Sequence, residues 1–146
     1  MRRLLLALAL VASGCAPSLS PTYRDYRVPT EATGSLDADL RAALTEAGWE
    51  EAPSGADNVI TTAPREIDAG LFSTTEATLD LAPLNDRFVR VYVHAIRRNV
   101  FGSRSKQPYL SPGLRKKALG PLTEAMAGRG LIALDEPRER DEEATD

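Results

Sequence analysis

The stretch that decides the fold runs from Leu71 to Arg98 and reads LFSTTEATLDL, APLND, RFVRVYVHAIRR. Small and aliphatic side chains occupy every second position from Ser73 to Leu81 and again from Val89 to Ala95. A period of two is typical of a strand with one buried face. The turn-forming residues within Ala82 to Asp86 separate the two halves. The sequence therefore predicts an antiparallel hairpin.

The hydrophobic pattern also predicts the register of this hairpin. With a loop at residues 82–86, Leu79 falls opposite Val89, which keeps the aliphatic side chains on one face. This register places both Glu76 and Asp80 diagonal to Arg90. We therefore expect cross-strand ion pairs on the other face. In the second strand this face carries Phe88, Arg90, Tyr92, His94, Ile96 and Arg98.

Helical spacing appears on both sides of the hairpin. Apolar residues from Leu36 to Ala47 form one stripe between an N-cap at Ser35 and a closing Gly48, and Trp49 is expected to fold back against it. A second helix opens at Ser111-Pro112. We expect residues 120–121, Gly-Pro, to break or kink this helix and residues 128–130 to end it.

The remaining segments predict short strands and a loop. Residues 58–62 predict one strand, residues 131–134 predict a final one, and residues 102–109 predict a polar loop. The resulting fold class is α+β, with a small antiparallel sheet of three to four strands and two helices on one face. The order, helix, three strands, helix and a possible last strand, loosely resembles the helix-grip domains of some outer-membrane-assembly lipoproteins.

We expect this domain to cover residues 35–135. Residues 15–34 contain three prolines among Ser, Thr and Gly and predict a tether. We expect its Tyr23 and Tyr26 to stack on the domain; the alternative is a position at the lipid headgroups. Residues 136–146 carry six acids and two arginines and predict a solvated acidic tail.

The first 14 residues have the layout of a secretory signal peptide. Arg2 and Arg3 precede an apolar run from Leu4 to Ala12, and small residues follow. Nine residues at 1.5 Å each cover only about half of a ~30 Å hydrocarbon core, so this run does not predict a spanning helix.

The end of the leader, VASGC at residues 11–15, resembles the lipobox of bacterial lipoproteins. The resemblance implies a covalent diacylglycerol and an acyl chain on Cys15, no other cofactor, and stable membrane anchoring. Ala16, where inner-membrane lipoproteins of enteric bacteria carry Asp, favours the outer membrane, facing the periplasm. The alternative is that Cys15 is a small apolar residue near an ordinary cleavage site.

Charge is segregated along the chain. Residues 86–117 hold nine basic residues and one acid, a net charge of +8, whereas residues 15–146 hold 16 basic and 21 acidic residues, a net charge of −5. A basic, partly aromatic surface predicts an anionic partner, either an envelope protein or an anionic lipid such as lipopolysaccharide. The alternative is a solvated face of ion-paired arginines. The predicted partner-binding residues are Arg90, Tyr92, His94, Arg98, Arg104, Lys106 and Tyr109.

No enzymatic motif is recognisable. The chain lacks a Gly-rich phosphate loop, a nucleophile elbow and an HExxH motif. One cysteine and one histidine exclude a finger-type zinc site, so no metal and no catalytic residue is predicted. An exported, anchored protein does not normally meet nucleic acid. We therefore expect a non-enzymatic adaptor; the alternatives are a carrier of lipid or lipopolysaccharide and a passive structural lipoprotein.

Overall fold

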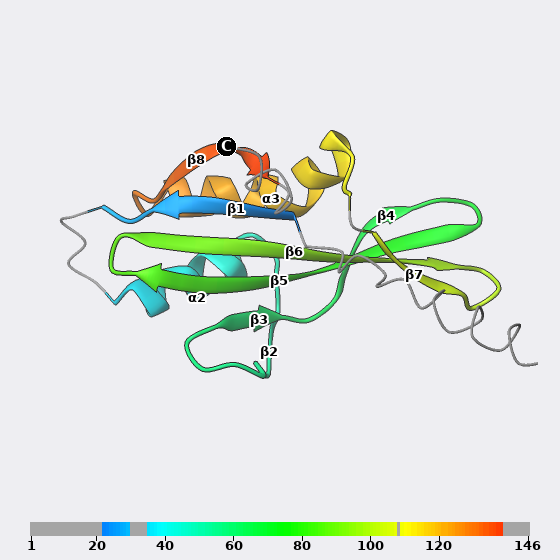
Figure 1. Ribbon diagram of the computed structural model, residues 1–146, viewed down its shortest axis with the longest axis horizontal. Helices are drawn as coiled ribbons and strands as arrows, with labels where there is room; N and C mark the ends of the chain where they lie inside the picture. The colour runs from blue at the N-terminus through cyan, green and yellow to red at the C-terminus, as the bar shows by residue number, and fades with distance from the viewer. Residues whose placement is uncertain (1–21, 30–34, 108, 139–146) are drawn as a thin grey trace, which may run out of the picture.

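The computed structural model describes residues 22–29, 35–107 and 109–138, which form two layers (Figure 1). One layer is an eight-stranded antiparallel sheet and the other holds two helices, which confirms the α+β class. The signal peptide, the lipobox with Cys15, and residues 139–146 lie outside the described residues. The elements in chain order are β1 (Thr22–Arg27), α2 (Leu36–Glu46), β2 (Glu51–Ala52), β3 (Ile60–Thr62), β4 (Arg65–Ala69), β5 (Ser73–Asn85), β6 (Phe88–Asn99), β7 (Arg104–Gln107), α3 (Pro112–Ala127) and β8 (Ile132–Arg138).

The β5–β6 hairpin forms the spine of the sheet. At its closed end the strand order is β2-β3-β5-β6-β1-β8, and at its other end β4 pairs with β5 and β7 pairs with β6. We call this second, four-stranded part (β4, residues 73–77 of β5, residues 95–99 of β6, and β7) the arm; it extends along the long axis of the molecule (Figure 1).

The predicted register of the hairpin is wrong by four residues. Leu79 pairs with Val93 instead of Val89, because pairing continues through Pro83 and the chain turns only after Asn85. The Asn85 side-chain oxygen accepts hydrogen bonds from the backbone N–H groups of residues 87 and 88, which fixes this tighter turn. An even shift leaves every side chain on its predicted face.

The predicted tether contains a central strand. β1 pairs with β6 on one side and with β8 on the other. Tyr23 and Tyr26 are only 2% and 0% exposed, and the Tyr26 hydroxyl lies 2.8 Å from the Thr123 hydroxyl on α3. The boundary at residue 35 is therefore wrong, because the domain includes residues 22–29. The acidic-tail boundary is wrong too, since β8 continues to Arg138.

Three further strands were not predicted, so a sheet of three to four strands and the predicted element order are both wrong. β2, β4 and β7 are short and charged, and β7 occupies the predicted polar loop. Such edge strands show no clear alternation because most of their side chains stay in water; in β4 only Ile67 is buried. Main-chain pairing with the spine holds them in place.

Both helices pack on the same face of the sheet. Residues from α2, α3 and the aliphatic face of β5 and β6 form one core, which includes Leu40, Leu44, Leu79, Leu81, Val91, Leu119, Leu122 and Met126. Trp49 folds back into this core, as predicted, and Gly48 adopts a positive φ at the end of α2. α3 runs through Pro121 as one helix, so of the two expectations, a break or a kink, the break is wrong. None of the helices in the described ranges is long and apolar enough to cross a membrane.

Candidate docking surface

The predicted β6 residues share the sheet face opposite the helices. Their neighbours along the strand, Val89, Val91, Val93 and Ala95, are all buried in the core. Because side chains alternate along a strand, Arg90, Tyr92, His94 and Arg98 point the other way. The prediction of which face each residue occupies is therefore confirmed.

Arg90 joins β6 to β1. Its Nε and Nη2 atoms donate hydrogen bonds to the two carboxylate oxygens of Asp25 at 2.7 and 2.8 Å, and its guanidinium lies 4.1 Å from the centre of the Tyr23 ring. The hydrogen bond to Asp25 raises the pKa of Arg90. Tyr92 lies beside the same ring, with a centroid separation of 6.1 Å. The bidentate contact between Arg90 and Asp25 therefore links β6 to β1.

His94 and Arg98 join β6 to β5. The Nε2 atom of His94 lies 2.9 Å from Asp80, whose other oxygen accepts a hydrogen bond from Thr61 at 2.7 Å. The Nε atom of Arg98 donates to Glu76 at 2.9 Å. The expected pairing of Glu76 and Asp80 with Arg90 is wrong, because it depended on the wrong register. Exposed pairs of this kind each contribute under about 1 kcal/mol.

Arg104 and Lys106 differ from the β6 cations. Both side chains are exposed on the edge strand β7, where Arg104 pairs in register with Arg98 and Lys106 with Ile96. Within residues 22–29, 35–107 and 109–138, neither has an acidic partner within ion-pair distance. Tyr109, 60% exposed, follows β7 before α3 begins. The predicted surface thus divides into β6 residues whose side chains contact β1 or β5, and β7 cations without an acidic partner in the part of the chain that the structure describes.

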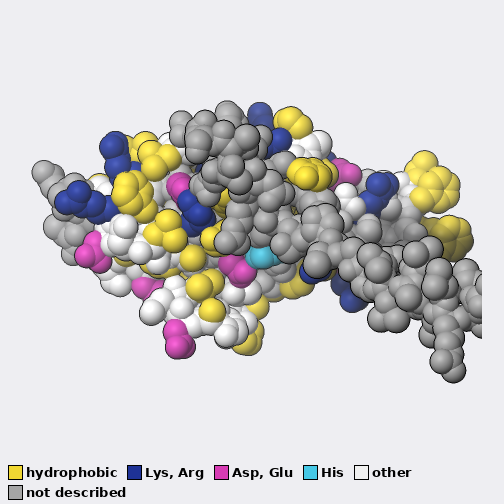
Figure 2. All heavy atoms as spheres, viewed as in Figure 1, with side chains coloured by type: hydrophobic (Ala, Val, Ile, Leu, Met, Phe, Trp, Pro, Cys, Tyr) yellow, Lys and Arg dark blue, Asp and Glu magenta, His cyan; other side chains and the backbone are white. Residues whose placement is uncertain are grey.

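One exposed feature was not predicted. Leu71, Phe72, Val100 and Phe101 lie at the end of the arm, in the β4–β5 and β6–β7 turns, and all four are largely exposed. Figure 2 shows hydrophobic side chains gathered at that end of the molecule. We call these four residues the apolar tip. The signal was present in the sequence as two apolar pairs, each adjacent to a turn glycine, at residues 70–72 and 100–102.

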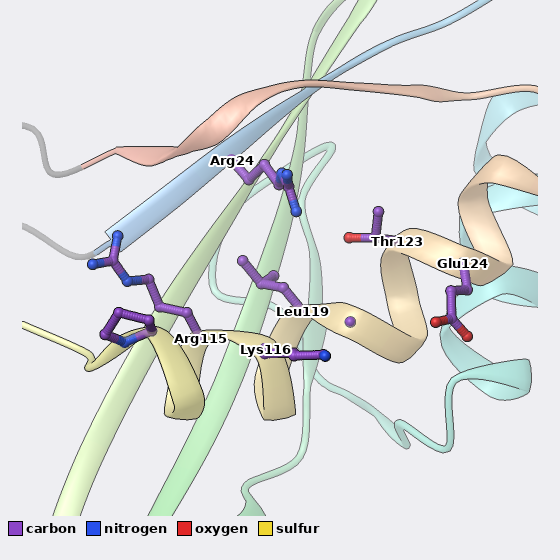
Figure 3. Close-up of a pocket in the computed structure, with 8 residues that line it drawn as sticks. Arg24, Arg115, Lys116, Leu119, Thr123 and Glu124 are labelled. Carbon is purple, nitrogen blue, oxygen red and sulfur yellow. The ribbon is translucent and has the colours of Figure 1, made fainter.

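A second feature is a groove of about 620 Å³ between β1 and α3. In Figure 3, Arg24 reaches from β1 toward α3, whose Lys116, Leu119 and Thr123 line the opposite wall. Arg115 and Glu124 complete its charged lining. The groove is open to solvent and its floor is the packed core at Leu119, so it can take a small anionic group at the surface.

The described part of the chain holds no cluster of three His, Cys, Asp or Glu residues that could bind a metal ion. No known protein family, curated protein or solved structure matches the chain. The functional argument therefore depends on the surface chemistry of the protein itself.

Proposed function

We propose that the protein is a non-enzymatic lipoprotein of the bacterial cell envelope. The lipobox resemblance at residues 11–15 supports anchoring through acylated Cys15, and Ala16 favours the outer membrane, facing the periplasm. The α+β domain then acts as an adaptor that docks on an anionic envelope component.

The observation that carries this proposal is that Arg104 and Lys106 are exposed and lack an acidic partner among the described residues. Arg90 and Arg98 are each paired with a carboxylate of a neighbouring strand, and His94 contacts Asp80 through Nε2. Arg104 and Lys106 are exposed on one face of an edge strand and have no acidic partner among the described residues. Their charges are available to a partner, whereas those of the β6 cations are largely compensated.

The test reverses both charges in the full-length, lipidated protein. The Arg104→Glu/Lys106→Glu variant is expressed in its native cell, and partner capture after crosslinking is quantified. Each cation near an anionic surface contributes about 1 kcal/mol, so capture should fall roughly tenfold or more. The melting temperature should stay unchanged, because both side chains are exposed.

A matched control carries the same charge change at the opposite end of the sheet. Arg27→Glu/Arg87→Glu alters two exposed arginines near the β5–β6 turn and should leave capture unchanged. Because charges on an edge strand also prevent edge-to-edge pairing, the oligomeric state of each variant is measured alongside. Equal capture by the β7 variant and the unsubstituted protein would contradict the proposal.

A carrier of lipid or lipopolysaccharide is the second candidate, and the β1–α3 groove favours it. Arg24, Arg115 and Lys116 suit an anionic headgroup. The space between sheet and helices, however, is filled by core side chains, which leaves the acyl chains outside. The test is mass spectrometry of protein purified without its anchor. Lipid that co-purifies with the unsubstituted protein and is lost in Lys116→Glu would support a carrier. Spectra that show the protein without any bound lipid would count against it.

A further inference from the structure

The apolar tip is made of two tight turns fixed side by side. In the β4–β5 turn, Gly70 N–H donates to the Ser73 carbonyl at 2.8 Å, and the Val100 N–H of the β6–β7 turn donates to the Phe72 carbonyl at 3.0 Å. The exposed fractions are 92% for Leu71, 72% for Phe72, 61% for Val100 and 89% for Phe101. Four large apolar side chains therefore point into solvent from a single end of the sheet.

The backbone holds this exposed arrangement in place. The Asn99 side-chain oxygen accepts hydrogen bonds from Phe101 N–H at 3.1 Å and Ser103 N–H at 2.9 Å, and Gly102 adopts a positive φ. Phe72 and Phe101 line a common hollow of about 330 Å³. Contiguous exposed apolar surface of this kind marks a membrane-contact or protein-contact site.

Cations lie directly behind the tip. Residues 97–107 contain Arg97, Arg98, Arg104 and Lys106 and no acid. Residues 69–75 contain no charge, and the acid that precedes them, Asp68, is paired with Lys117. Arg98 is paired with Glu76, and Arg97 donates to the hydroxyl of Ser73 and has no acidic partner among the described residues. Arg104, the first residue of β7, follows Phe101 by three residues across the turn at Gly102. The cations therefore begin directly behind the apolar tip, as the headgroup layer lies directly outside the hydrocarbon core of a bilayer.

We propose that the apolar tip inserts into the interfacial layer of an anionic phospholipid bilayer, while Arg97, Arg104 and Lys106 contact the headgroup phosphates. The tip lies at the end of the long axis, where exposed apolar side chains with cations behind them fit a soft planar surface. A protein partner would instead have to supply a pocket for it. The inference rests on the proposed docking role of Arg104 and Lys106 and names the bilayer as their partner.

The test reads the environment of one position in the tip. The full 146-residue chain carries Cys15→Ser and Ser103→Cys, and the new thiol holds an environment-sensitive nitrobenzoxadiazole dye. A second protein carries the dye at Asp86→Cys, in the turn at the opposite end of the β5–β6 hairpin. Because the apolar leader can itself attach to vesicles, dye environment is measured instead of binding. Vesicles contain phosphatidylcholine with or without phosphatidylglycerol and carry nitroxide-labelled lipid as quencher.

With phosphatidylglycerol present, dye at position 103 should shift to the blue and be quenched, and dye at position 86 should do neither. Adding Leu71→Ser and Phe101→Ser should reduce the blue-shifted fraction at least about tenfold, since insertion depends on apolar area. No shift at 103, an equal shift at 86, or an equal shift without anionic lipid would overturn the inference. If the dye at position 103 stays in water while partner capture in cells still requires Arg104 and Lys106, bilayer insertion is refuted and the adaptor role is retained.

Discussion

Replacing Tyr26 with alanine tests whether β1 belongs to the domain. The Tyr26 ring is fully buried between the sheet and α3. Truncating a buried aromatic side chain to alanine costs about 3–5 kcal/mol, and loss of the hydrogen bond to Thr123 adds about 1 kcal/mol. A domain of this size is stable by about 5–15 kcal/mol in total, so Tyr26→Ala should remove about a quarter or more of the free energy of unfolding.

The assay is urea unfolding of the whole chain, monitored by far-ultraviolet circular dichroism. The free energies of unfolding of the variants are compared with one common m value, the slope of free energy against urea concentration. Tyr26→Phe keeps the ring and should lose only about 1 kcal/mol. Tyr109→Ala removes an exposed ring and should change stability by no more than about 0.5 kcal/mol. A loss below about 1 kcal/mol for Tyr26→Ala would refute the reasoning, because residues 22–27 would then be a tether and not a strand.

Three further outcomes follow from the same contacts. Burial raises the pKa of Tyr26 above its ordinary 10.0, so the folded chain keeps a proton that the unfolded chain releases. The free energy of unfolding should therefore fall as pH rises above 10.0 and through the folded pKa of Tyr26. In Tyr26→Phe, which has no hydroxyl to ionise, urea titrations at alkaline pH should show a smaller fall. Asp25→Asn weakens a charged hydrogen-bond pair with Arg90 and should lower stability by about 1–2 kcal/mol in urea melts. Thr62→Val orphans the buried Leu79 N–H, whose bond to the Thr62 hydroxyl is 2.8 Å, and should cost about 1–3 kcal/mol by calorimetry.

Each of these predictions has a matched control. Tyr109→Phe should leave the alkaline loss as it is in the unsubstituted chain, because Tyr109 is exposed. Asp37→Asn, in an exposed pair with Arg41, should change stability by less than about 0.5 kcal/mol. Thr62→Ser keeps the hydroxyl and should retain most of the stability lost in Thr62→Val. Equal losses in a variant and its control would contradict the assigned contact.

The sequence predicted what the core dictates. The period of two in β5 and β6 follows from burial of one face, and the helical stripe at residues 36–47 follows from packing on that face. The register was wrong because hydrophobic alternation repeats every two residues and cannot distinguish Val89 from Val93 as the partner of Leu79. The register is instead determined by the turn, in which the Asn85 side-chain oxygen accepts hydrogen bonds from the N–H groups of residues 87 and 88.

Two strands, β1 and β7, were not predicted because their local composition is typical of a tether and a loop. Prolines near β1 favoured a tether, but Tyr23 and Tyr26 gain burial that only the folded sheet provides. β7 reads as a polar loop because no side-chain pattern is needed on an edge strand whose main chain pairs with β6. Tertiary context outweighed local composition in both segments.

The candidate surface was predictable in position but not in its pairing. Alternation places Arg90 and His94 on the open face, yet the Arg90 partner, Asp25, is 65 residues away and lies in a strand that was not predicted. Arg104 and Lys106 could be chosen from charge alone, and their exposure agrees with that choice. The apolar tip escaped notice because four large apolar residues usually predict a core.

The central claim is that exposed cations on β7 contact an anionic component of the envelope, and a photo-crosslinker tests it most directly. A benzophenone amino acid is placed at Lys106 in the full-length protein in its native cell, and at Arg87 for reference; adducts are identified by mass spectrometry. The account predicts a reproducible adduct with one anionic protein or lipid from position 106 and none from position 87. No adduct from position 106, or the same adducts from both positions, would contradict it.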